Sequence, residues 1–138
     1  MTAKEYLSRG RRLDELIDSD VRELQRLRHL AMSITPNYEG EPVSGGEVKS
    51  RTEEIVVKIC SLEERIQSEI DDYVDVQREI REAIVNVKNP NERLLLRERY
   101  IIFRSWEDIA EKMGYSVRSV YTIHGRALRK IKVPETLQ

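Results

Sequence analysis

Arginine, lysine and hydroxyl side chains recur between residues 116 and 130, and these residue types bind phosphates and base edges. Arg118, Arg126, Arg129 and Lys130 supply the positive charges. A guanidinium group can donate two parallel hydrogen bonds, which suit either a phosphate or the edge of a guanine. The chemistry available to this segment is therefore binding to a polyanion.

The chain holds few residues that could carry catalysis. Its histidines are His29 and His124, and neither lies at metal-ligand spacing from a second cluster of cysteine, histidine or acidic residues. We interpret His124 as a neutral surface or edge residue. No glycine-rich loop that could cradle phosphate occurs, and Asp71 and Asp72 fall on a predicted solvated helix face. We therefore expect a protein that is not an enzyme and that uses no cofactor and no metal.

The composition favours exposed helices and divides the charge unevenly. Of the 138 residues, 36% are charged and 6% are aromatic, which suits helices better than a thick core of sheet and helix. Residues 1–90 hold 14 basic and 19 acidic side chains, whereas residues 91–132 hold 10 basic and 5 acidic ones. This asymmetry indicates a polyanionic partner for the C-terminal part of the chain.

The expected compartment follows from the apolar runs and the single cysteine. No apolar run is long enough to span a bilayer, and the first residues, MTAKEYLSRGRR, lack the apolar core of a signal peptide. Cys60 cannot form an internal disulfide, and its apolar neighbours lead us to interpret it as a buried core residue. We expect a cytoplasmic protein without membrane contact.

The basic segment falls within two short predicted helices joined by a turn, from Trp106 to Ile131. Such a pair needs apolar inner faces, a small residue where the helices cross and a turn residue that accepts positive φ. The residues at those positions are Ile109, Ala110, Met113, Gly114, Val120 and Ile123. Ser105 and Ser116 suit the two N-caps. This spacing predicts a helix-turn-helix, with a plain helical hairpin as the alternative.

The second helix of such a motif lies in the major groove of double-stranded DNA. The predicted DNA-binding residues are Ser116, Val117, Arg118, Ser119, Tyr121, Thr122, Arg126, Arg129 and Lys130. We expect Val117 and Arg118 to point outward near the start of the helix, where Arg118 can contact guanine with ~1–3 kcal/mol of discrimination. The basic residues near its end would contact phosphates, which makes the affinity depend on salt.

Three further helices must hold this motif in place. They are predicted at residues 2–33, 47–87 and 91–103, the third capped by Asn89 and begun by Pro90. Prolines and glycines in Ile34–Gly46 forbid a continuous helix there, and the sequence assigns that loop no role. The expected fold is all-α, with a long helical hairpin or coiled coil over residues 1–88, a helix-turn-helix domain over 89–133 and a tail over 134–138.

The second long helix carries an apolar stripe with a mean step near half a heptad, as in a coiled-coil seam. Its members are Val48, Ile55, Ile59, Leu62, Ile66, Ile70, Tyr73, Val76, Ile80, Ile84 and Val87. An antiparallel hairpin with the shorter first helix would leave part of this stripe uncovered. A second copy or the C-terminal domain could cover it, and we expect a homodimer formed through residues 47–87.

Several motifs resemble a known family. The segment 91–131 resembles region 4 of bacterial sigma factors, which reads promoter DNA and touches RNA polymerase. Over nearly its full length the chain resembles small proteins of phages and prophages of Gram-positive bacteria. The matching motifs are RYI at Arg99–Ile101, SWEDIAEKMGYS at Ser105–Ser116 and HGRALRK at His124–Lys130. The resemblance implies a transcription regulator.

One departure from sigma region 4 affects the expected target. That module usually begins its recognition helix with a Thr-Arg-Glu-Arg-like run in which the glutamate reads bases, whereas this chain has Ser116, Val117, Arg118 and Ser119. We therefore expect a different DNA site. The alternatives are a module that binds RNA polymerase with little DNA contact and a DNA-packaging recognition subunit of the small-terminase type, although the latter usually carries its DNA-binding part first.

Overall fold

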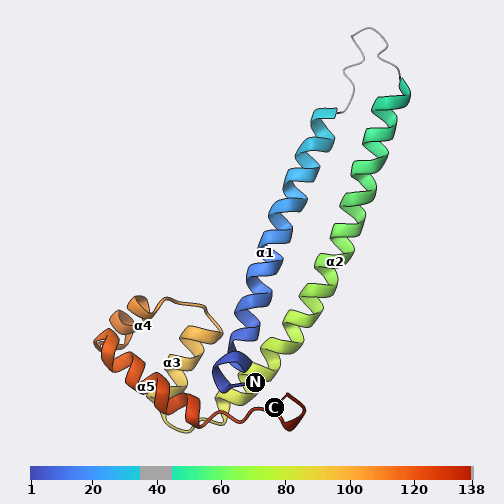
Figure 1. Cartoon of the computed structure of the whole chain (residues 1–138). Helices are drawn as coiled ribbons and strands as arrows, with labels where there is room; N and C mark the ends of the chain where they lie inside the picture. The colour runs from blue at the N-terminus through green and yellow to red at the C-terminus, as the bar shows by residue number, and fades with distance from the viewer. Residues whose placement is uncertain (35–44, 138) are drawn as a thin grey trace. The chain divides into compact units, whose positions relative to one another are not determined.

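The computed structural model describes residues 1–34 and 45–137, and within them every regular element is a helix (Figure 1). The expected all-α class is confirmed for these residues. The helices are α1 (Ala3–Ile34), α2 (Gly45–Val85), α3 (Pro90–Tyr100), α4 (Trp106–Met113) and α5 (Val117–Arg129), followed by the 3-10 turn η1 (Glu135–Leu137). Most of the predicted loop Ile34–Gly46, namely residues 35–44, lies outside the described residues.

The helix starts are defined by side chains that cap them. Before α1, the Thr2 hydroxyl accepts a hydrogen bond from the Glu5 backbone N–H at 3.1 Å, while the Glu5 carboxylate accepts one from the Thr2 N–H at 2.8 Å. This reciprocal pair is a capping box. Before α3, the Asn89 side chain accepts from Asn91 and Glu92 at 3.0 and 3.2 Å, as predicted.

The bounds of the first three helices differ from the predicted ones by one to three residues, and two of these differences have a clear physical reason. α2 begins at Gly45 instead of residue 47, because glycine is tolerated in a first turn whose N–H groups have no intrahelical partners. α3 ends at Tyr100 and not at Phe103. Beyond it the Arg104 N–H bonds back to the Glu98 carbonyl at 2.9 Å, and Phe103 adopts a left-handed φ of 66° that no α-helix contains.

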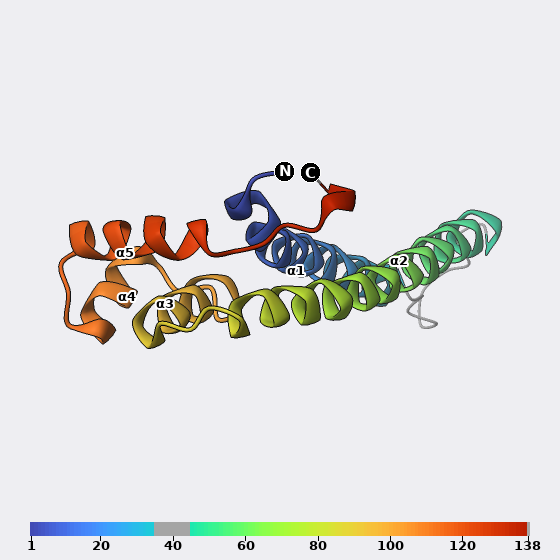
Figure 2. The same ribbon diagram turned by 90° about the horizontal axis from the view of Figure 1, so that it is seen from below.

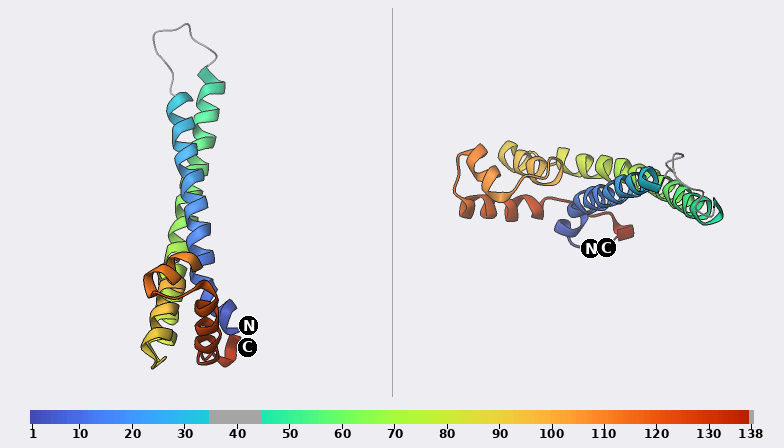
Figure 3. Two further views of the ribbon diagram at one scale, coloured as in Figure 1. Left: turned by 90° about the vertical axis from the view of Figure 1, so that its left-hand side faces the viewer. Right: turned by 90° about the horizontal axis from the view of Figure 1, so that it is seen from above.

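The chain divides into two compact units, residues 15–71 and residues 1–14 with 72–138. The predicted boundary near residue 88 stays a prediction. In the unit 15–71, α1 and α2 run antiparallel (Figure 3), and Leu24, Leu62 and Ile66 form its buried cluster. Arg28 pairs with Glu63 at 2.9 Å across the two helices.

The other unit packs the first turns of α1 and the end of α2 with α3, α4 and α5 around one core (Figure 2). Its largest fully buried side chains are Leu7, Ile80, Ile84, Val87, Leu95, Leu96, Ile109 and Val120. Gly10 lets α1 approach α2 closely, because a Cβ there would lie 3.1 Å from the Ile80 Cδ1 atom.

The apolar stripe of α2 is largely covered within the chain, and Cys60 lies beside it. Leu62, Ile66, Ile80 and Ile84 are buried, although Ile70 is 37% exposed. The prediction that Cys60 is a core residue is wrong, because its side chain is exposed. It follows the half-buried Ile59 by one residue, and one residue turns a helix by about 100°. No helix in the described residues is both long and apolar enough to cross a membrane.

Candidate nucleic-acid interface

The local structure from Ser105 to Ser119 agrees with the predicted caps and turn. The Ser105 hydroxyl accepts a hydrogen bond from the Asp108 N–H, and the Ser116 hydroxyl accepts one from the Ser119 N–H, both at 3.1 Å. Between the two helices Gly114 has a φ of 72°, which L side chains rarely adopt. α5 therefore begins directly after a short, well-defined turn.

The inner face of α5 is held by the helices around it. Val120 and Ala127 are fully buried, and Ile123 and Leu128 pack against the same core from half-buried positions. α5 contacts both α3 and α4. Because interiors are close-packed, this burial fixes which side of α5 faces solvent.

The outer face of α5 presents three arginines and a tyrosine. Arg118, Arg126 and Arg129 are exposed, and Tyr121 is 50% exposed. Among residues 1–34 and 45–137, no acidic side chain pairs with these three arginines. The Thr122 hydroxyl is also exposed and donates to the Arg118 carbonyl at 3.2 Å, so its lone pairs remain free to accept. The outer face therefore carries uncompensated positive charge.

Two residues predicted to contact DNA are placed otherwise. Val117 is half-buried and packs against the core instead of pointing outward, since the inner apolar face of α5 begins with this residue. The Lys130 ammonium lies 2.5 Å from a Glu92 carboxylate oxygen, and Glu92 is only 5% exposed. Lys130 therefore joins the end of α5 to the start of α3, and its charge is already compensated.

The serines at the start of α5 are engaged with each other. The Ser116 hydroxyl donates to the Ser119 hydroxyl at 3.0 Å. Ser116 is exposed, whereas Ser119 is half-buried. Of the two, Ser116 is better placed to meet a ligand, and Ser119 mainly supports the cap.

A chain of aromatic and cation–π contacts that the sequence analysis missed supports the exposed Tyr121. Its ring centroid lies 5.1 Å from that of Trp106, and the Arg99 guanidinium lies 4.4 Å from the Trp106 ring centroid. Arg99 also donates to the Arg104 carbonyl at 2.9 Å. These contacts tie α3, α4 and α5 together and restrict the Tyr121 ring on the outer face. In the sequence, the only signal for these contacts is that several aromatic residues lie close together between positions 100 and 121.

His124 lies beneath this chain and is 7% exposed. Its Nε2 atom is 2.6 Å from the Tyr100 hydroxyl oxygen, and the Trp106 ring meets it edge-on at 4.6 Å. Burial, followed by the charges of Lys4 and Arg99, lowers the pKa of His124 to about 4. The expected surface or edge position is therefore wrong, because the inner face of α5 includes His124. A histidine with this pKa is neutral near pH 7, as expected.

Glu98 is a second buried acid, and it compensates two more basic residues. It is 3% exposed, and one carboxylate oxygen accepts from the Lys112 ammonium at 2.6 Å. The other oxygen lies 2.7 Å from the Arg104 Nε atom, although that N–H is not aligned for a hydrogen bond. Lys112 and Arg104 therefore add no free positive charge. The uncompensated charge of the C-terminal helices is more concentrated on α5 than the count of basic residues over 91–132 implies.

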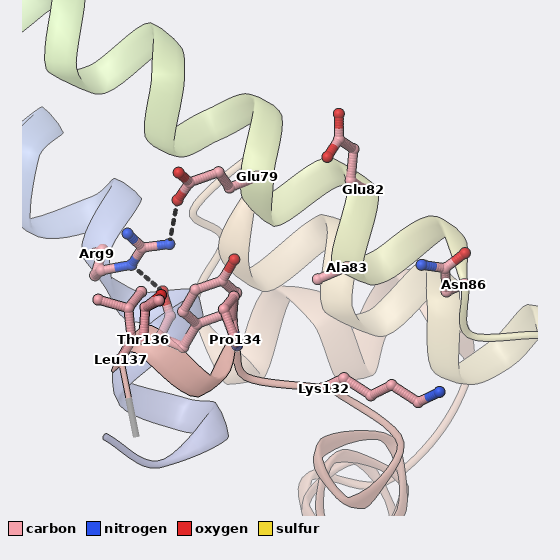
Figure 4. A pocket seen from close by; sticks show the side chains of 10 residues that line it. Arg9, Glu79, Glu82, Ala83, Asn86, Lys132, Pro134, Thr136 and Leu137 are labelled. Carbon is pink, nitrogen blue, oxygen red and sulfur yellow. Dashed lines mark hydrogen bonds and ion pairs between the residues drawn. The ribbon is translucent and has the colours of Figure 1, made fainter.

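An open pocket beside the first turns of α1 has a different character (Figure 4). The Arg9 guanidinium lies there 2.7 Å from a Glu79 carboxylate oxygen, and its Nε donates to the Tyr6 carbonyl at 3.0 Å. Pro134 and Leu137 of the predicted tail line the same pocket. Its principal cation is thus already paired, and the outer face of α5 remains the better candidate for a polyanion.

The comparisons with known proteins give one match. A family model described as "Protein of unknown function (DUF1492)" matches residues 31–132, which include α2 to α5. Neither a curated protein nor a solved structure matches the chain.

Proposed function

The chain belongs to the DUF1492 family, and we propose that it is a sequence-specific transcription regulator that binds double-stranded DNA through α5. In this proposal α4, the Gly114 turn and α5 act as a helix-turn-helix. The observation that carries it is the outer face of α5, where Arg118, Arg126 and Arg129 have no acidic partner in the described residues. A helix of this kind attracts the phosphates of DNA.

The length and position of the three arginines support this assignment. Arg118 and Arg129 are eleven residues apart on α5, which at ~1.5 Å per residue corresponds to about 16 Å. The major groove is about 12 Å wide. Arg118 can therefore face base edges while Arg129 meets phosphates at the groove wall. The resemblance to sigma region 4 and to small phage regulators agrees with this orientation of the helix.

Selection from a random pool of DNA duplexes tests the function directly. We expect an enriched motif and an affinity that falls steeply between low and high salt. Arg118→Ala should relax one position of the motif and lower affinity for the selected site about 5- to 150-fold, the equivalent of a lost paired base contact. Arg26→Ala, which removes an exposed arginine from α1, is the matched control and should leave both unchanged.

Absence of any duplex binding at low salt would refute the proposal. That result would favour a function in binding another protein. RNA polymerase would be the first partner to test and a DNA-packaging assembly the second. If the selected motif is equally well defined in the Arg118→Ala variant, the protein binds DNA but Arg118 does not recognise a base.

We also propose that two copies associate through α2, which would present two DNA-binding helices to a symmetric site. The side of α2 that faces α1 is already packed, but Val56, Val74 and Val85 remain 47%, 57% and 64% exposed. Their spacing puts them on one face of the helix. In an antiparallel pair centred between residues 70 and 71, Val56 would meet the second copy's position 85.

Cross-linking distinguishes this arrangement from other pairings. In a Cys60→Ser background, an Ile70→Cys variant should form a disulfide-linked dimer on oxidation, because position 70 would lie beside its own copy. Val57→Cys, one residue outside the face defined by Val56 and Val74, is the matched control and should not. A dimer linked through Cys60 in the unaltered chain would instead indicate parallel helices, and a monomeric mass in sedimentation would refute association.

A further inference from the structure

Gly125 stands in the middle of α5, and the fold does not explain a glycine there. A Cβ at Gly10 would lie 3.1 Å from the Ile80 side chain, and Gly114 has a φ of 72°, so both of these glycines have a reason in the fold. A Cβ at Gly125 would meet no atom within 4 Å. Glycine inside a helix is less favourable than alanine, because it loses more backbone freedom on folding. The isolated fold would therefore favour alanine at this position.

The position of Gly125 on the helix connects it to the proposed interface. Tyr121 precedes it by four residues and Thr122 by three, while Arg129 follows it by four. Residues three and four apart share a face of an α-helix. Arg118, seven residues earlier, belongs to the same face. At Gly125 the backbone of α5 is thus bare, and the side chains around it are the ones that we expect to contact DNA.

We propose that Gly125 is the point at which α5 approaches the DNA most closely, with the sugar–phosphate wall of the major groove packed against its bare backbone. This inference rests on the proposed function. Gly125 lies about 10 Å along the helix from Arg118, which is close to the width of the groove. When Arg118 reaches base edges, Gly125 passes the groove wall. Arg126 and Arg129 then flank the same strand and bind its phosphates.

The inference gives one substitution two effects of opposite sign. Gly125→Ala should raise the melting temperature by about 2–4 °C, because the helix gains propensity and the methyl group meets nothing. It should also lower the affinity for DNA about tenfold, because the methyl group overfills a packed contact. The loss should be equal for the selected site and for an unrelated duplex, since contacts to sugar and phosphate carry no sequence information. Gly125→Leu should lose more affinity than the alanine variant.

The experiment measures melting curves and DNA titrations for the unaltered protein, Gly125→Ala and Gly125→Leu. Gln25→Ala, at an exposed position of α1, is a helix-favouring control that should leave affinity unchanged. A Gly125→Ala protein that is more stable and binds DNA as well as the unaltered protein would overturn the inference. A less stable one would also overturn it, because the fold itself would then require the glycine. The unaltered protein is titrated first. If it binds no duplex, the result refutes the proposed function and not only the inference about Gly125.

Discussion

Lowering the pH from 7 to 5 should destabilise the protein through His124. In the folded chain burial and the nearby charges of Lys4 and Arg99 lower the His124 pKa from 6.5 to about 4. Between these two values the unfolded chain binds a proton that the folded chain does not, so the free energy of unfolding decreases as the pH falls. Integration from pH 7 to pH 5 gives a loss of about 2 kcal/mol from this one side chain.

Urea unfolding at the two pH values, compared between the unaltered protein and His124→Gln, measures this contribution. Glutamine does not titrate, and its amide can still form a hydrogen bond with the Tyr100 hydroxyl, which lies 2.6 Å from His124 in the structure. We expect the unaltered protein to lose about 2 kcal/mol more than the variant over this range. Gln25→Ala, at an exposed position of α1, should change with pH as the unaltered protein does, because it removes no titratable group.

Parallel loss of stability in the unaltered and His124→Gln proteins would refute the reasoning. It would mean that His124 takes up its proton equally in the folded and unfolded chains, and that water reaches its ring in the folded chain. The comparison removes the contribution of carboxylates, which titrate in both proteins.

The ion pairs of the two buried glutamates give the remaining predictions. Glu98→Gln should reduce the free energy of unfolding by about 1–3 kcal/mol in a denaturant titration, because Lys112 and Arg104 both lose a buried carboxylate; a change below the error of that titration would contradict the assigned role. Lys130→Ala should cost about 1–2 kcal/mol of stability by leaving Glu92 unpaired. Its effect on DNA affinity should be smaller than that of Arg129→Ala, and the reverse order would show that Lys130 contacts phosphate after all.

Local signals predicted the C-terminal helices well. The Asn89, Ser105 and Ser116 caps and the left-handed Gly114 each depend on a few adjacent residues, and the structure contains all of them. The end of α3 depends instead on backbone hydrogen bonds that wrap around Phe103 in a left-handed conformation. A phenylalanine gives no sequence signal for a left-handed conformation. The predicted end of α3 is therefore three residues too late.

The errors in the candidate site arise from contacts between distant residues. Lys130 meets Glu92 across 38 residues, and the Tyr100 hydroxyl meets His124 across 24. No periodicity within α5 reveals either partner. Counting charges along the chain therefore overestimated the free basic surface. The surface position expected for His124 is wrong because its partner Tyr100 lies on another helix. The exposed arginines were correctly identified as exposed because a helical face can be deduced from the spacing of apolar residues alone.

The participation of Tyr6 and Leu7 in the C-terminal core has a consequence for folding during synthesis. Both side chains belong to the same buried cluster as Ala127 and Ile131, which are made more than a hundred residues later. The first two turns of α1 can therefore complete their native contacts only after Ile131 has been synthesised. Contacts of such sequence separation form slowly, since the loop between them must first close. Tyr6 and Leu7 thus precede some of their native neighbours by more than a hundred positions, and until those neighbours arrive they are a surface on which chaperones can act.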